Sequence, residues 1–320
     1  MQRIPDYVKL VETTLAQQNF DQSPKELYAP MGYILALGGK RLRPALSLAA
    51  CELFGTPANK AIMPALGIEV FHNFSLVHDD IMDQADLRRG QATVHKKWNR
   101  DIAILSGDAM LVKAYQYIAQ VEAPILPAVL ECFSQTALEI CEGQQRDMNF
   151  ENREAVSEAE YLLMIRQKTA VLLGAALKIG ALVAGAEMKA ANSLYEFGIN
   201  AGLSFQVQDD LLDAYGNPDK VGKTAGGDIL QDKKTLLMIY ARELDPEGWS
   251  DLRNAQLEGN EKVSTYREWM IACGAKTKAE AKRDALLKEA LEALEAAHAP
   301  DEELKNELAQ FAQWLSHRDR

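Results

Sequence analysis

The sequence is poor in several features that identify particular classes of protein. It has only four cysteines in 320 residues, at positions 51, 132, 141 and 273, and none of them forms a CxxC pair. Reduced core cysteines of a cytoplasmic protein are therefore expected. Positive charge is also scarce, because 35 Lys and Arg stand against 46 Asp and Glu, a net charge of -11. A nucleic-acid-binding protein normally carries a basic surface, so this function is not expected.

Long hydrophobic runs are absent as well. The most apolar stretch, from Val171 to Ala184, carries Lys178 and is too short to span a bilayer, so we interpret it as a buried core helix. The first residues, MQRIPDYVKL, have neither an apolar core nor a small-residue cleavage site, and no secretory signal is expected. The composition therefore predicts a cytoplasmic protein without stable membrane insertion.

Alternating strand patterns are missing, and helical periodicity runs through most of the chain. No linker or shift in composition marks a boundary, so we expect an all-α fold in a single domain over residues 1–320. Asp301, which follows Pro300, is expected to be the N-cap of the last helix. Helices are predicted near residues 5–18, 23–37, 42–54, 59–83, 100–120, 124–148, 155–184, 189–214, 229–244, 262–273, 279–297 and 301–316.

The most informative pattern is a pentad of two aspartates, two apolar residues and a third aspartate, which occurs twice. The first is DDIMD at 79–83 and the second is DDLLD at 209–213. The first and last aspartates of each pentad are four residues apart, so on a helix they share one face. Like charges packed this closely need protons or cations to neutralise them. Magnesium usually binds through a few carboxylates plus substrate phosphates, so two such patches could hold several ions and one polyanion.

Basic residues accompany both pentads. RRG at 88–90 follows the first, and GKTAGGD at 222–228 and KKT at 233–235 follow the second. Upstream, GGKRLRP at 38–44 places three basic residues after a Gly-Gly turn and just before a helix, whose N-terminus favours anions. Arginine binds phosphate oxygens in a bidentate manner, so phosphate clamps are one interpretation of these segments. A structural ion network or charged surface loops are the other.

One histidine has a suggestive position. His72 lies seven residues before Asp79 and faces the same way on a helix, whereas His78 points elsewhere. A structural histidine is the alternative for His72. Other acid chemistries fit poorly, because neither pentad has the pattern of an EF-hand and six aspartates exceed the need of a two-carboxylate hydrolase. No GxSxG, HExxH or P-loop motif occurs.

Taken together, these motifs resemble the polyprenyl synthetase family of trans-isoprenyl diphosphate synthases, in particular its short-chain farnesyl and geranylgeranyl diphosphate synthases. The resemblance implies the isoprenoid synthase fold, a bundle of antiparallel helices around a large central cavity, and a homodimer. Lys233-Lys234-Thr235 departs from a more usual Gly-Lys of the family, which leaves the role of Lys234 open. The matching segments are GGKRLRP (38–44), HNFSLVHDDIMDQADLRRG (72–90), KTA (168–170), FQVQDDLLD (205–213), GKTAGGD (222–228) and KKT (233–235).

The resemblance also implies a role for each matching residue. Magnesium ions, three in each active site, would be bound by Asp79, Asp80 and Asp83 and by Asp209, Asp210 and Asp213. The allylic diphosphate would contact Arg88, Lys168, Lys223 and Lys233, with Thr169 and Gln206 beside the reacting carbon. Isopentenyl diphosphate would be held without metal by Lys40, Arg43, His72 and Arg89. The residues expected to act in catalysis itself are Asp79, Asp83, Arg88, Lys168, Asp209 and Lys223.

By resemblance, the reaction is a magnesium-dependent head-to-tail (1'-4) condensation of isopentenyl diphosphate with an allylic diphosphate, which releases diphosphate. Product length should depend on what lies below the first pentad, where helix rise puts Phe74 about 7 Å and Phe71 about 12 Å from Asp79. In the family, a large residue five positions before the first aspartate often sets the pocket floor. Here it is Phe74, next to the small Ser75. This pattern predicts an all-trans C15 to C20 product, with simple core residues as the alternative for both phenylalanines.

Two other functions stay open from the sequence. A terpene cyclase also ionises allylic diphosphates, but its second metal motif is usually an Asn/Ser/Glu arrangement and it needs no isopentenyl diphosphate site. A non-catalytic regulatory subunit of a prenyl synthase would have lost acidic residues, whereas both pentads are intact here.

Overall fold

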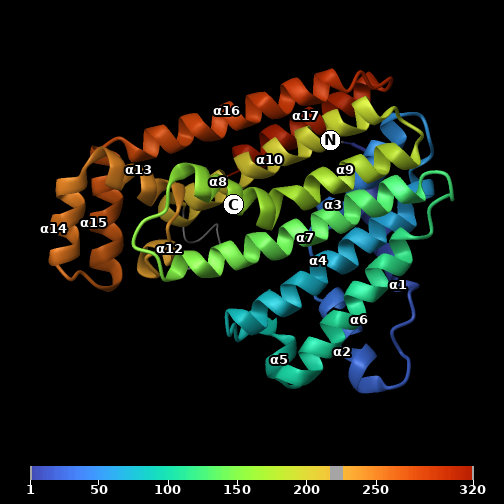
Figure 1. Ribbon diagram of the computed structural model, residues 1–320, viewed down its shortest axis with the longest axis horizontal. Coiled ribbons are helices and arrows are strands. Elements are labelled where there is room, and N and C mark those ends of the chain that lie inside the picture. Colours follow the sequence, from blue (N-terminus) through green and yellow to red (C-terminus); the bar gives the residue numbers. More distant parts are fainter. Residues whose placement is uncertain (1, 217–225, 319–320) are drawn as a thin grey trace. The chain divides into compact units, whose positions relative to one another are not determined.

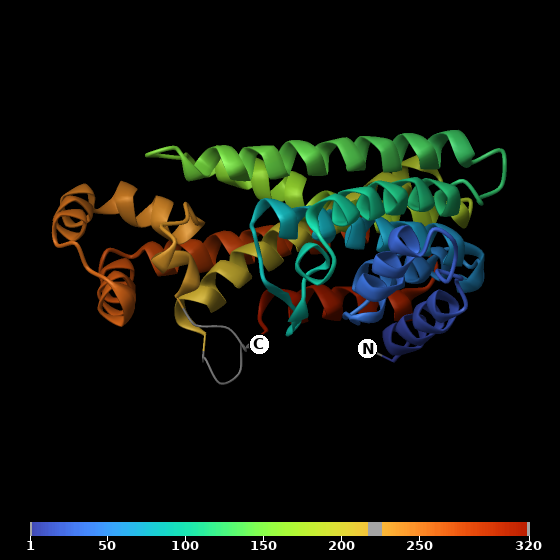
Figure 2. The same cartoon turned by 90° about the horizontal axis from the view of Figure 1, so that it is seen from below.

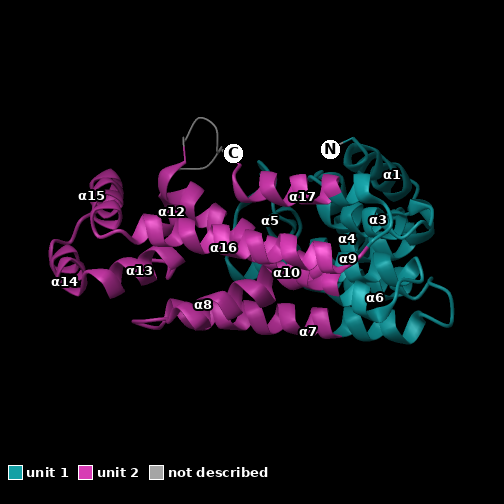
Figure 3. Ribbon diagram, turned by 90° about the horizontal axis from the view of Figure 1, so that it is seen from above, with its two compact units in different colours: residues 1–134, 175–192, 299–305 teal, residues 135–174, 193–298, 306–320 magenta. Residues whose placement is uncertain are grey.

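The computed structural model describes residues 2–216 and 226–318, which are almost entirely helical (Figure 1). The prediction of an all-α fold is therefore confirmed. The chain forms two compact units (Figure 3). Unit 1 comprises Met1–Ser134, Ala175–Asn192 and Ala299–Lys305, and unit 2 comprises Gln135–Gly174, Ser193–His298 and Asn306–Arg320. Within the described residues, no helix combines the length and the apolar character needed to cross a bilayer.

Unit 1 is built around α4 (Ile62–Met82), the helix that leads into the first aspartate pentad. Its side chains are apolar around most of its circumference, which is typical of a helix inside the core. It packs along α6 (Arg100–Ile118), and Gly67 permits a close approach, since a Cβ there would lie 3.0 Å from the Ala114 carbonyl oxygen. The other elements are α1 (Ile4–Ala16), α2 (Lys25–Ala36), α3 (Leu42–Leu53), the 3-10 helix η1 (Ala58–Ala61), β1 (Leu87–Arg88), β2 (Gln91–Ala92) and α5 (Val94–Lys97).

The RRG motif forms the turn of a small hairpin that the sequence did not predict. β1 and β2 pair antiparallel, with Leu87 opposite Ala92 and Arg88 opposite Gln91. The connecting residues, Arg89 and Gly90, both have positive φ angles of 52° and 75°, as a type I′ hairpin turn requires. Strands of two residues are too short to show an alternating pattern, which is why the periodicity gave no sign of them.

Unit 2 carries the second pentad near the end of α10 (Met188–Tyr215), whose first residues belong to unit 1. α10 lies close to the start of α9 (Val171–Val183), since a Cβ on Gly198 would lie 2.6 Å from the Cα of Gly174. Figures 1 and 2 show α13, α14 and α15 as a group at one end of this unit. Its helices include α7 (Leu126–Glu151), which begins in unit 1, α8 (Glu158–Ile165), the π-helical turn η2 (Arg166–Ala170), α12 (Gly227–Leu230), α13 (Leu236–Leu244), α14 (Pro246–Asn254), α15 (Gly259–Ala272), α16 (Ala275–Ala296) and α17 (Glu302–Ser316), which also begins in unit 1.

The prediction of one uninterrupted α-helix over 155–184 is wrong. α8 begins after a capping box, in which Ser157 and Glu160 bond each other's main chain. The helix then widens into the π-helical turn η2, which contains Lys168 and Thr169, before α9 continues. A π turn adds one residue to a single turn, and hydrophobic periodicity over the surrounding helix is too coarse to reveal it.

The predicted helix over 229–244 is also wrong, because two helices cover that range. α12 ends at Leu230, and Asp232 adopts a left-handed φ of 52° that turns the chain before α13 begins. The prediction missed α14 altogether, although its start has a clear signal: Asp245 accepts a hydrogen bond from Gly248 N at 3.0 Å, and Pro246 occupies the first helical position.

The expected cap of the last helix is confirmed. Leu304 N donates to Asp301 Oδ1 at 2.9 Å, and α17 begins at Glu302. Arg3 in α1's N-cap position also binds Asp301, at 2.6 Å, so the same carboxylate ties this helix start to the N-terminal part of unit 1.

Candidate active site

The first pentad divides into one buried aspartate and two accessible ones. Asp80 is 1% exposed and accepts two hydrogen bonds from Arg88, both at 2.8 Å. Asp79 is half-buried, and Asp83, directly after α4, is exposed. Helix geometry explains the division, because neighbouring residues point about 100° apart around the axis while residues four apart share a face. Arg88, predicted as a phosphate contact, is thereby held in position by Asp80.

The second pentad has the same division. Asp210 is buried and accepts a hydrogen bond from the hydroxyl of Tyr161. Burial raises the pKa of the Asp210 carboxyl to about 7, against the opposing effect of the Tyr161 hydrogen bond. Asp209 and Asp213 are half-buried; Asp213 accepts from Asp228 N at 2.9 Å, and Asp209 is bound by the guanidinium of Arg318.

The donor set of the two pentads fits magnesium bound with a phosphate ligand. The described residues contain no group of three or more His, Cys, Asp or Glu side chains that could hold a metal ion on its own. Magnesium seldom uses such all-protein cages, and instead combines one or two carboxylates with substrate phosphates and water. The accessible carboxylates of each pentad, Asp79 with Asp83 and Asp209 with Asp213, are oxygen donors of this kind.

A cluster of cationic side chains lies in unit 1, where the predicted GGKRLRP loop meets the hairpin. The guanidinium of Arg89 lies against the backbone of Gly39, so close that a Cβ there would be 2.9 Å from one of its nitrogens. Arg43, on the first turn of α3, lies 3.3 Å from Nε2 of His72 on α4. Three of the four residues predicted to hold isopentenyl diphosphate thus lie on elements that meet here; the fourth, Lys40, is an exposed residue of the same loop.

The cationic cluster carries more positive charge than its surroundings neutralise. Burial lowers the pKa of Arg43 and of Arg89, and neighbouring guanidiniums lower both further. The pKa of His72 lies well below its usual value for the same two reasons, burial first and then the nearby arginines. Burial is the larger cause of these shifts and Glu69 opposes them in both arginines, but the repulsion between neighbouring cations adds to them, so an anion bound there would be stabilised.

Arg41 is a residue of this region that the sequence analysis did not single out. It is buried, donates to Glu69 Oε1 and to the Leu35 carbonyl oxygen, both at 2.5 Å, and has a left-handed φ of 46°. Its contacts fix the loop between α2 and α3 in the shape that presents Lys40 and Arg43. Arg41 was not singled out because other basic residues lie next to it in the same motif, and the sequence does not show which of them is buried.

The predicted polar residues of unit 2 gather around the π-helical turn. Lys168 Nζ lies 2.5 Å from Asp147 of α7, and Thr169 Oγ1 lies 3.4 Å from Gln206 of α10. Gly143 makes room for the turn, since a Cβ there would lie 2.4 Å from Lys168 N. Lys233 pairs with Asp228 at 3.0 Å. Lys223, the other lysine predicted to bind the allylic diphosphate, lies outside the described residues.

Asp147, Tyr161 and Arg318 are polar partners that the sequence analysis missed. Each contacts a predicted residue: Asp147 binds Lys168, Tyr161 binds Asp210 and Arg318 binds Asp209. Asp147 lies one turn after Gly143 on α7, which is a local signal that could have been used. Tyr161 and Arg318 are distant in sequence from the second pentad and belong to no motif, so only the folded chain reveals them.

An aromatic cluster lies beneath the first pentad, as the position of Phe74 suggested. Phe71 and Phe74 are 1% and 9% exposed, with ring centroids 5.4 Å apart. Phe71 also meets Phe133 at 5.2 Å, and Phe133 meets Tyr115 at 4.9 Å. Ser75 donates its hydroxyl hydrogen bond back to the His72 carbonyl oxygen. The cluster therefore includes two rings, Phe133 and Tyr115, that sequence spacing from Asp79 could not reveal.

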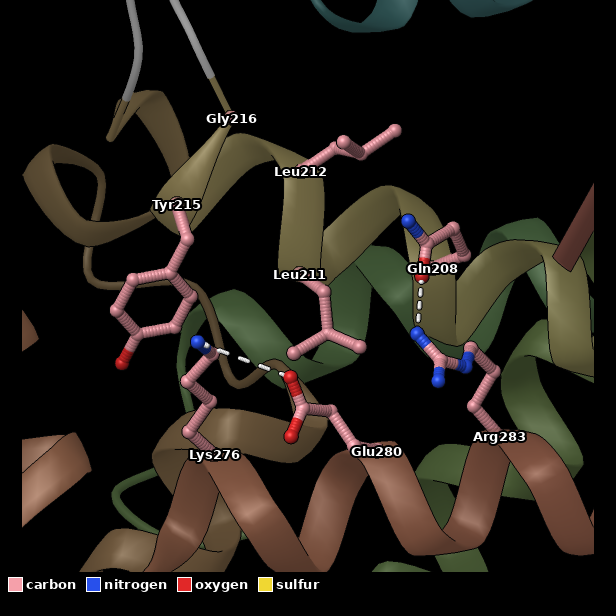
Figure 4. A pocket seen from close by; sticks show the side chains of 8 residues that line it. All are labelled: Gln208, Leu211, Leu212, Tyr215, Gly216, Lys276, Glu280 and Arg283. Carbon is pink, nitrogen blue, oxygen red and sulfur yellow. Dashed lines mark hydrogen bonds and ion pairs between the residues drawn. The ribbon is translucent and has the colours of Figure 1, made fainter. Parts of the chain in front are cut away.

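The opposite side of α10 from this polar network offers little room for a ligand. A cavity of about 150 Å³ lies between α10 and α16, and its charged side chains already have polar partners within the lining. In Figure 4 the guanidinium of Arg283 donates to Gln208 Oε1 at 2.8 Å, and Lys276 lies 3.7 Å from Glu280. This cavity gives no reason to extend the candidate site.

Comparison with known proteins identifies the family to which the chain belongs. The Polyprenyl synthetase family model matches residues 24–272. The chain belongs to the polyprenyl synthetase family. It is 44% identical over 243 residues to the geranylgeranyl pyrophosphate synthase of Geoglobus acetivorans, which covers 75% of this chain and 76% of that protein. It is 38% identical over 272 residues to the geranylfarnesyl diphosphate synthase of Natronomonas pharaonis, with 78% and 80% covered.

The fold is that of other polyprenyl synthetases. A crystal structure of a geranylgeranyl pyrophosphate synthase matches this chain with a TM-score of 0.93 and 40% identity, and each chain is covered completely. The resemblance drawn from the sequence motifs is thus confirmed at the level of family and of fold. The family match includes every motif on which that resemblance rested, from residue 38 to residue 235.

Proposed function

We propose that this polyprenyl synthetase is a prenyltransferase that joins isopentenyl diphosphate head-to-tail (1'-4) to allylic diphosphates and releases diphosphate. The observation that carries the proposal is the arrangement of its polar residues. Each aspartate pentad keeps two carboxylates accessible, and the cationic cluster of Arg43, His72 and Arg89 is placed to receive an anion. The relatives described above, whose names are those of C20 and C25 prenyl diphosphate synthases, support the same reaction class.

The two accessible carboxylates of each pentad are proposed to bind divalent metal, with three magnesium ions serving one allylic diphosphate. Metal bound there neutralises the diphosphate and stabilises the negative charge that develops on it as the carbon–oxygen bond breaks. Asp80 and Asp210, being buried, support this arrangement by fixing Arg88 and Tyr161. Arg88, Lys168, Lys223 and Lys233 are proposed to bind the oxygens of the leaving diphosphate.

Isopentenyl diphosphate is proposed to bind the cationic cluster without metal. Arg43 and Arg89 supply hydrogen bonds of fixed direction, and Lys40 supplies a point charge from the exposed part of the loop. His72 stays neutral beside Arg43, because burial and the arginines lower its pKa. Its ring can therefore accept a hydrogen bond from Arg43 and hold that guanidinium toward the anion, without adding a further positive charge.

The carbon chemistry needs a dry environment more than it needs a catalytic base. Cleavage of an allylic diphosphate leaves a carbocation that water would destroy, so the apolar residues of α4 and α10 are proposed to exclude water. Thr169 and Gln206, 3.4 Å apart, are proposed to lie beside the reacting carbon. The released diphosphate is proposed to take the proton lost when the new double bond forms.

The direct test is incubation of the purified protein with magnesium, labelled isopentenyl diphosphate and dimethylallyl, geranyl or farnesyl diphosphate, followed by product mass. We expect labelled C15 to C20 prenyl diphosphates. A hydrocarbon or alcohol product without label would instead indicate a terpene cyclase. No turnover by the protein alone would indicate a regulatory subunit.

Product length is proposed to be limited by Phe74, the phenylalanine of α4 that is nearest the pentad in sequence. Replacing Phe74 by Ala removes a ring that packs on Phe71 and His78, at 5.4 and 4.8 Å, and opens space for a longer chain. We expect Phe74→Ala to shift the product toward C25 or longer on thin-layer analysis or mass spectrometry. Ser75→Ala, which removes only a hydroxyl bonded to the His72 carbonyl, serves as the control. An unchanged product length in Phe74→Ala would contradict the assignment.

The chain is further proposed to act as one polyprenyl synthetase domain over residues 1–320 and to form a homodimer. In unit 1, α6 exposes Leu105 and Val112, which are 60% and 59% accessible. They are seven residues apart and so lie on one face of the helix. An exposed apolar stripe of this kind commonly marks an association surface, and a twofold dimer is the commonest assembly of identical chains.

A further inference from the structure

A second cavity lies in unit 2, lined by residues to which the proposed reaction assigns no role. It has a volume of about 620 Å³ and is enclosed by the end of α7, by α13, α14 and α15, and by the short connections next to them. These helices form the group at one end of the unit in Figures 1 and 2. Its volume lies within the range of about 300–1,000 Å³ that is usual for small-molecule sites.

The lining of this α13–α15 cavity has more basic than acidic residues. Five basic residues, Arg153, Lys234, Arg242, Arg253 and Lys262, stand with three acidic ones, Glu151, Glu154 and Asp232. Lys262 pairs with Asp232 at 2.8 Å, Arg253 with Glu154 at 3.8 Å and Arg153 with Glu160 at 2.7 Å, so the excess lies on Lys234 and Arg242. This excess contrasts with the net charge of -11 on the whole chain. Basic residues concentrated in one hollow of an acidic protein favour an anionic ligand.

Two of these cations are held by neutral acceptors. Lys234 Nζ donates to the Glu151 carbonyl oxygen at 3.2 Å, and Arg242 donates to the Glu154 carbonyl oxygen at 2.5 Å. A carbonyl oxygen orients a cation but does not cancel its charge. Lys234 and Arg242 are therefore fixed in direction while their positive charge remains available to an anion, as preorganised binding requires.

One wall of the cavity is aromatic and rigid. Trp249 and Tyr266 line it, and the guanidiniums of Arg242 and Arg253 lie 4.7 and 5.7 Å from the Trp249 ring centre. Trp269 stacks on Trp249 at 6.0 Å and is itself held by a 2.8 Å hydrogen bond to Asp245. Such a wall offers a flat apolar surface next to guanidiniums, so a ligand with both an anionic and a flat unsaturated part would match it.

Lys234 belongs to this cavity, whereas the adjacent Lys233 belongs to the proposed reaction site. Its neighbour Lys233 pairs with Asp228, whose main-chain N–H in turn donates to Asp213 of the second pentad. Lys234 instead points to the end of α7 and lines the α13–α15 cavity. The two adjacent lysines thus contribute to two different sites. The second lysine of this motif, whose role the sequence left open, lines the α13–α15 cavity.

We propose that the α13–α15 cavity is a second ligand site, which binds a small molecule carrying a phosphate or diphosphate group and a flat unsaturated part. The anionic group is bound by Lys234 and Arg242, and the flat part packs on Trp249. This assignment does not depend on the proposed reaction, because none of its residues belongs to the pentads or to the cationic cluster. An aromatic nucleotide and a prenyl diphosphate both combine a phosphate group with an unsaturated part, a planar ring in one and locally planar double bonds in the other, and the experiment distinguishes them.

The test is a fluorescence and calorimetric titration of the purified full chain in EDTA, with ADP and with geranyl diphosphate as separate probes. EDTA removes the metal on which the pentads are proposed to depend. The tryptophan signal of Trp249, which lines the cavity, then separates binding there from binding at the cationic cluster, which is proposed to need no metal. We expect at least one probe to bind and to change tryptophan emission, and we expect Trp249→Phe to remove most of that change. The tighter probe identifies the source of the ligand.

Matched variants locate the binding. Lys234→Ala/Arg242→Ala is expected to weaken binding about tenfold or more, a loss of about 1.4 kcal/mol or more. Lys288→Ala, which removes a lysine whose side chain is 79% exposed on α16, is expected to bind as the wild type does. Arg89→Ala is also expected to bind normally, because Arg89 belongs to the cationic cluster.

Four outcomes would overturn the proposal. They are absence of binding by both probes, unchanged affinity in the double variant, loss of binding in Arg89→Ala alone, and equal affinity for inorganic diphosphate. The last would show anion binding without use of the aromatic wall. If the double variant fails to fold by circular dichroism, Lys234→Ala replaces it, because the hydrogen bond of that lysine to the Glu151 carbonyl oxygen is exposed, and an affinity equal to that of the wild type then counts against the proposal.

Discussion

At the scale of single residues, neighbouring aspartates in one pentad have different physical roles. Asp80 and Asp210 are buried and bonded by Arg88 and Tyr161, while the flanking aspartates keep access to solvent. The sequence analysis assigned all six to metal binding and only Asp79, Asp83 and Asp209 also to catalysis, because a DDxxD pattern does not show which carboxylate turns inward. Mutation should therefore separate stability from activity within five consecutive residues.

Asp79→Ala and Asp80→Asn are expected to fail in different ways. Asp79→Ala removes a carboxylate that we propose to bind metal, so kcat/KM should fall by about 100-fold or more with little change in the unfolding midpoint. Asp80→Asn removes the charge partner of Arg88 from a buried position and should lower the free energy of unfolding by about 1–3 kcal/mol. Denaturant unfolding and steady-state kinetics measure both. A fully stable Asp80→Asn variant would contradict this division.

The pH dependence of the free energy of unfolding should reveal the lowered pKa of His72. The pKa of His72 in the folded protein lies well below the 6.5 of a free histidine. Below pH 6.5 this imidazole is therefore protonated in the unfolded chain while it stays neutral in the folded chain. This contribution to stability is present above that pH and is lost as the pH falls, by up to about 1.4 kcal/mol per pH unit.

His72→Gln isolates the histidine, since other titrating groups, including Asp210, are common to both proteins. We expect the stability difference between wild type and variant to shift in favour of the variant as the pH falls from 7 to 5, in urea unfolding series. A difference that stays constant over this range would show that His72 titrates normally in the folded state.

At the scale of elements, the π-helical turn is the feature that brings Lys168 and Thr169 to their positions. Gly143 on α7 lies so close that a Cβ would be 2.4 Å from Lys168 N and 2.8 Å from Lys168 Cα. Main-chain atoms of a helix cannot yield as a flexible side chain does. A residue without a side chain is therefore required on α7 opposite this turn.

Gly143→Ala is expected to displace the turn. Overpacking of this kind costs about 1–3 kcal/mol, and activity should fall further than stability, because Lys168 moves away from Asp147. Gln145→Ala, an exposed position on the same helix, provides the control and should leave both properties near wild type. Wild-type activity in Gly143→Ala would mean that the position of the turn does not matter for the reaction.

The helices and turns also show how much of the secondary structure could be predicted from the sequence. Long periodic helices such as α4, α6 and α10 were predicted within a few residues, because a wide apolar face persists over many turns. The π turn, the hairpin at Leu87–Ala92 and the break at Asp232 were not, since each depends on one or two residues. Likewise, the motifs located the pentads and Arg43. The contacts of Tyr161 and Arg318 with the second pentad could not be predicted, because these residues are distant from it in sequence and are brought to it only by folding.

At the scale of the whole molecule, the proposed homodimer depends on α6. Leu105→Glu with Val112→Glu places charges on its exposed apolar stripe, and burying unpaired charge in an interface is unfavourable. We expect the wild type to be a dimer and the double variant a monomer by light scattering coupled to size exclusion. Gln120→Glu, exposed just beyond α6, should remain dimeric. A monomeric wild type, or a dimeric double variant, would exclude this interface.

The repulsion within the cationic cluster has a consequence beyond the reaction. Arg43 and Arg89 lie near His72, and part of the lowering of all three pKa values comes from neighbouring cations, so a diphosphate bound there, as proposed, would relieve that repulsion and stabilise the folded protein. A ligand present at about 100 times its dissociation constant adds about 2.7 kcal/mol to the free energy of unfolding. In a cell, the survival of this enzyme against heat and proteases would then follow the supply of its own precursor.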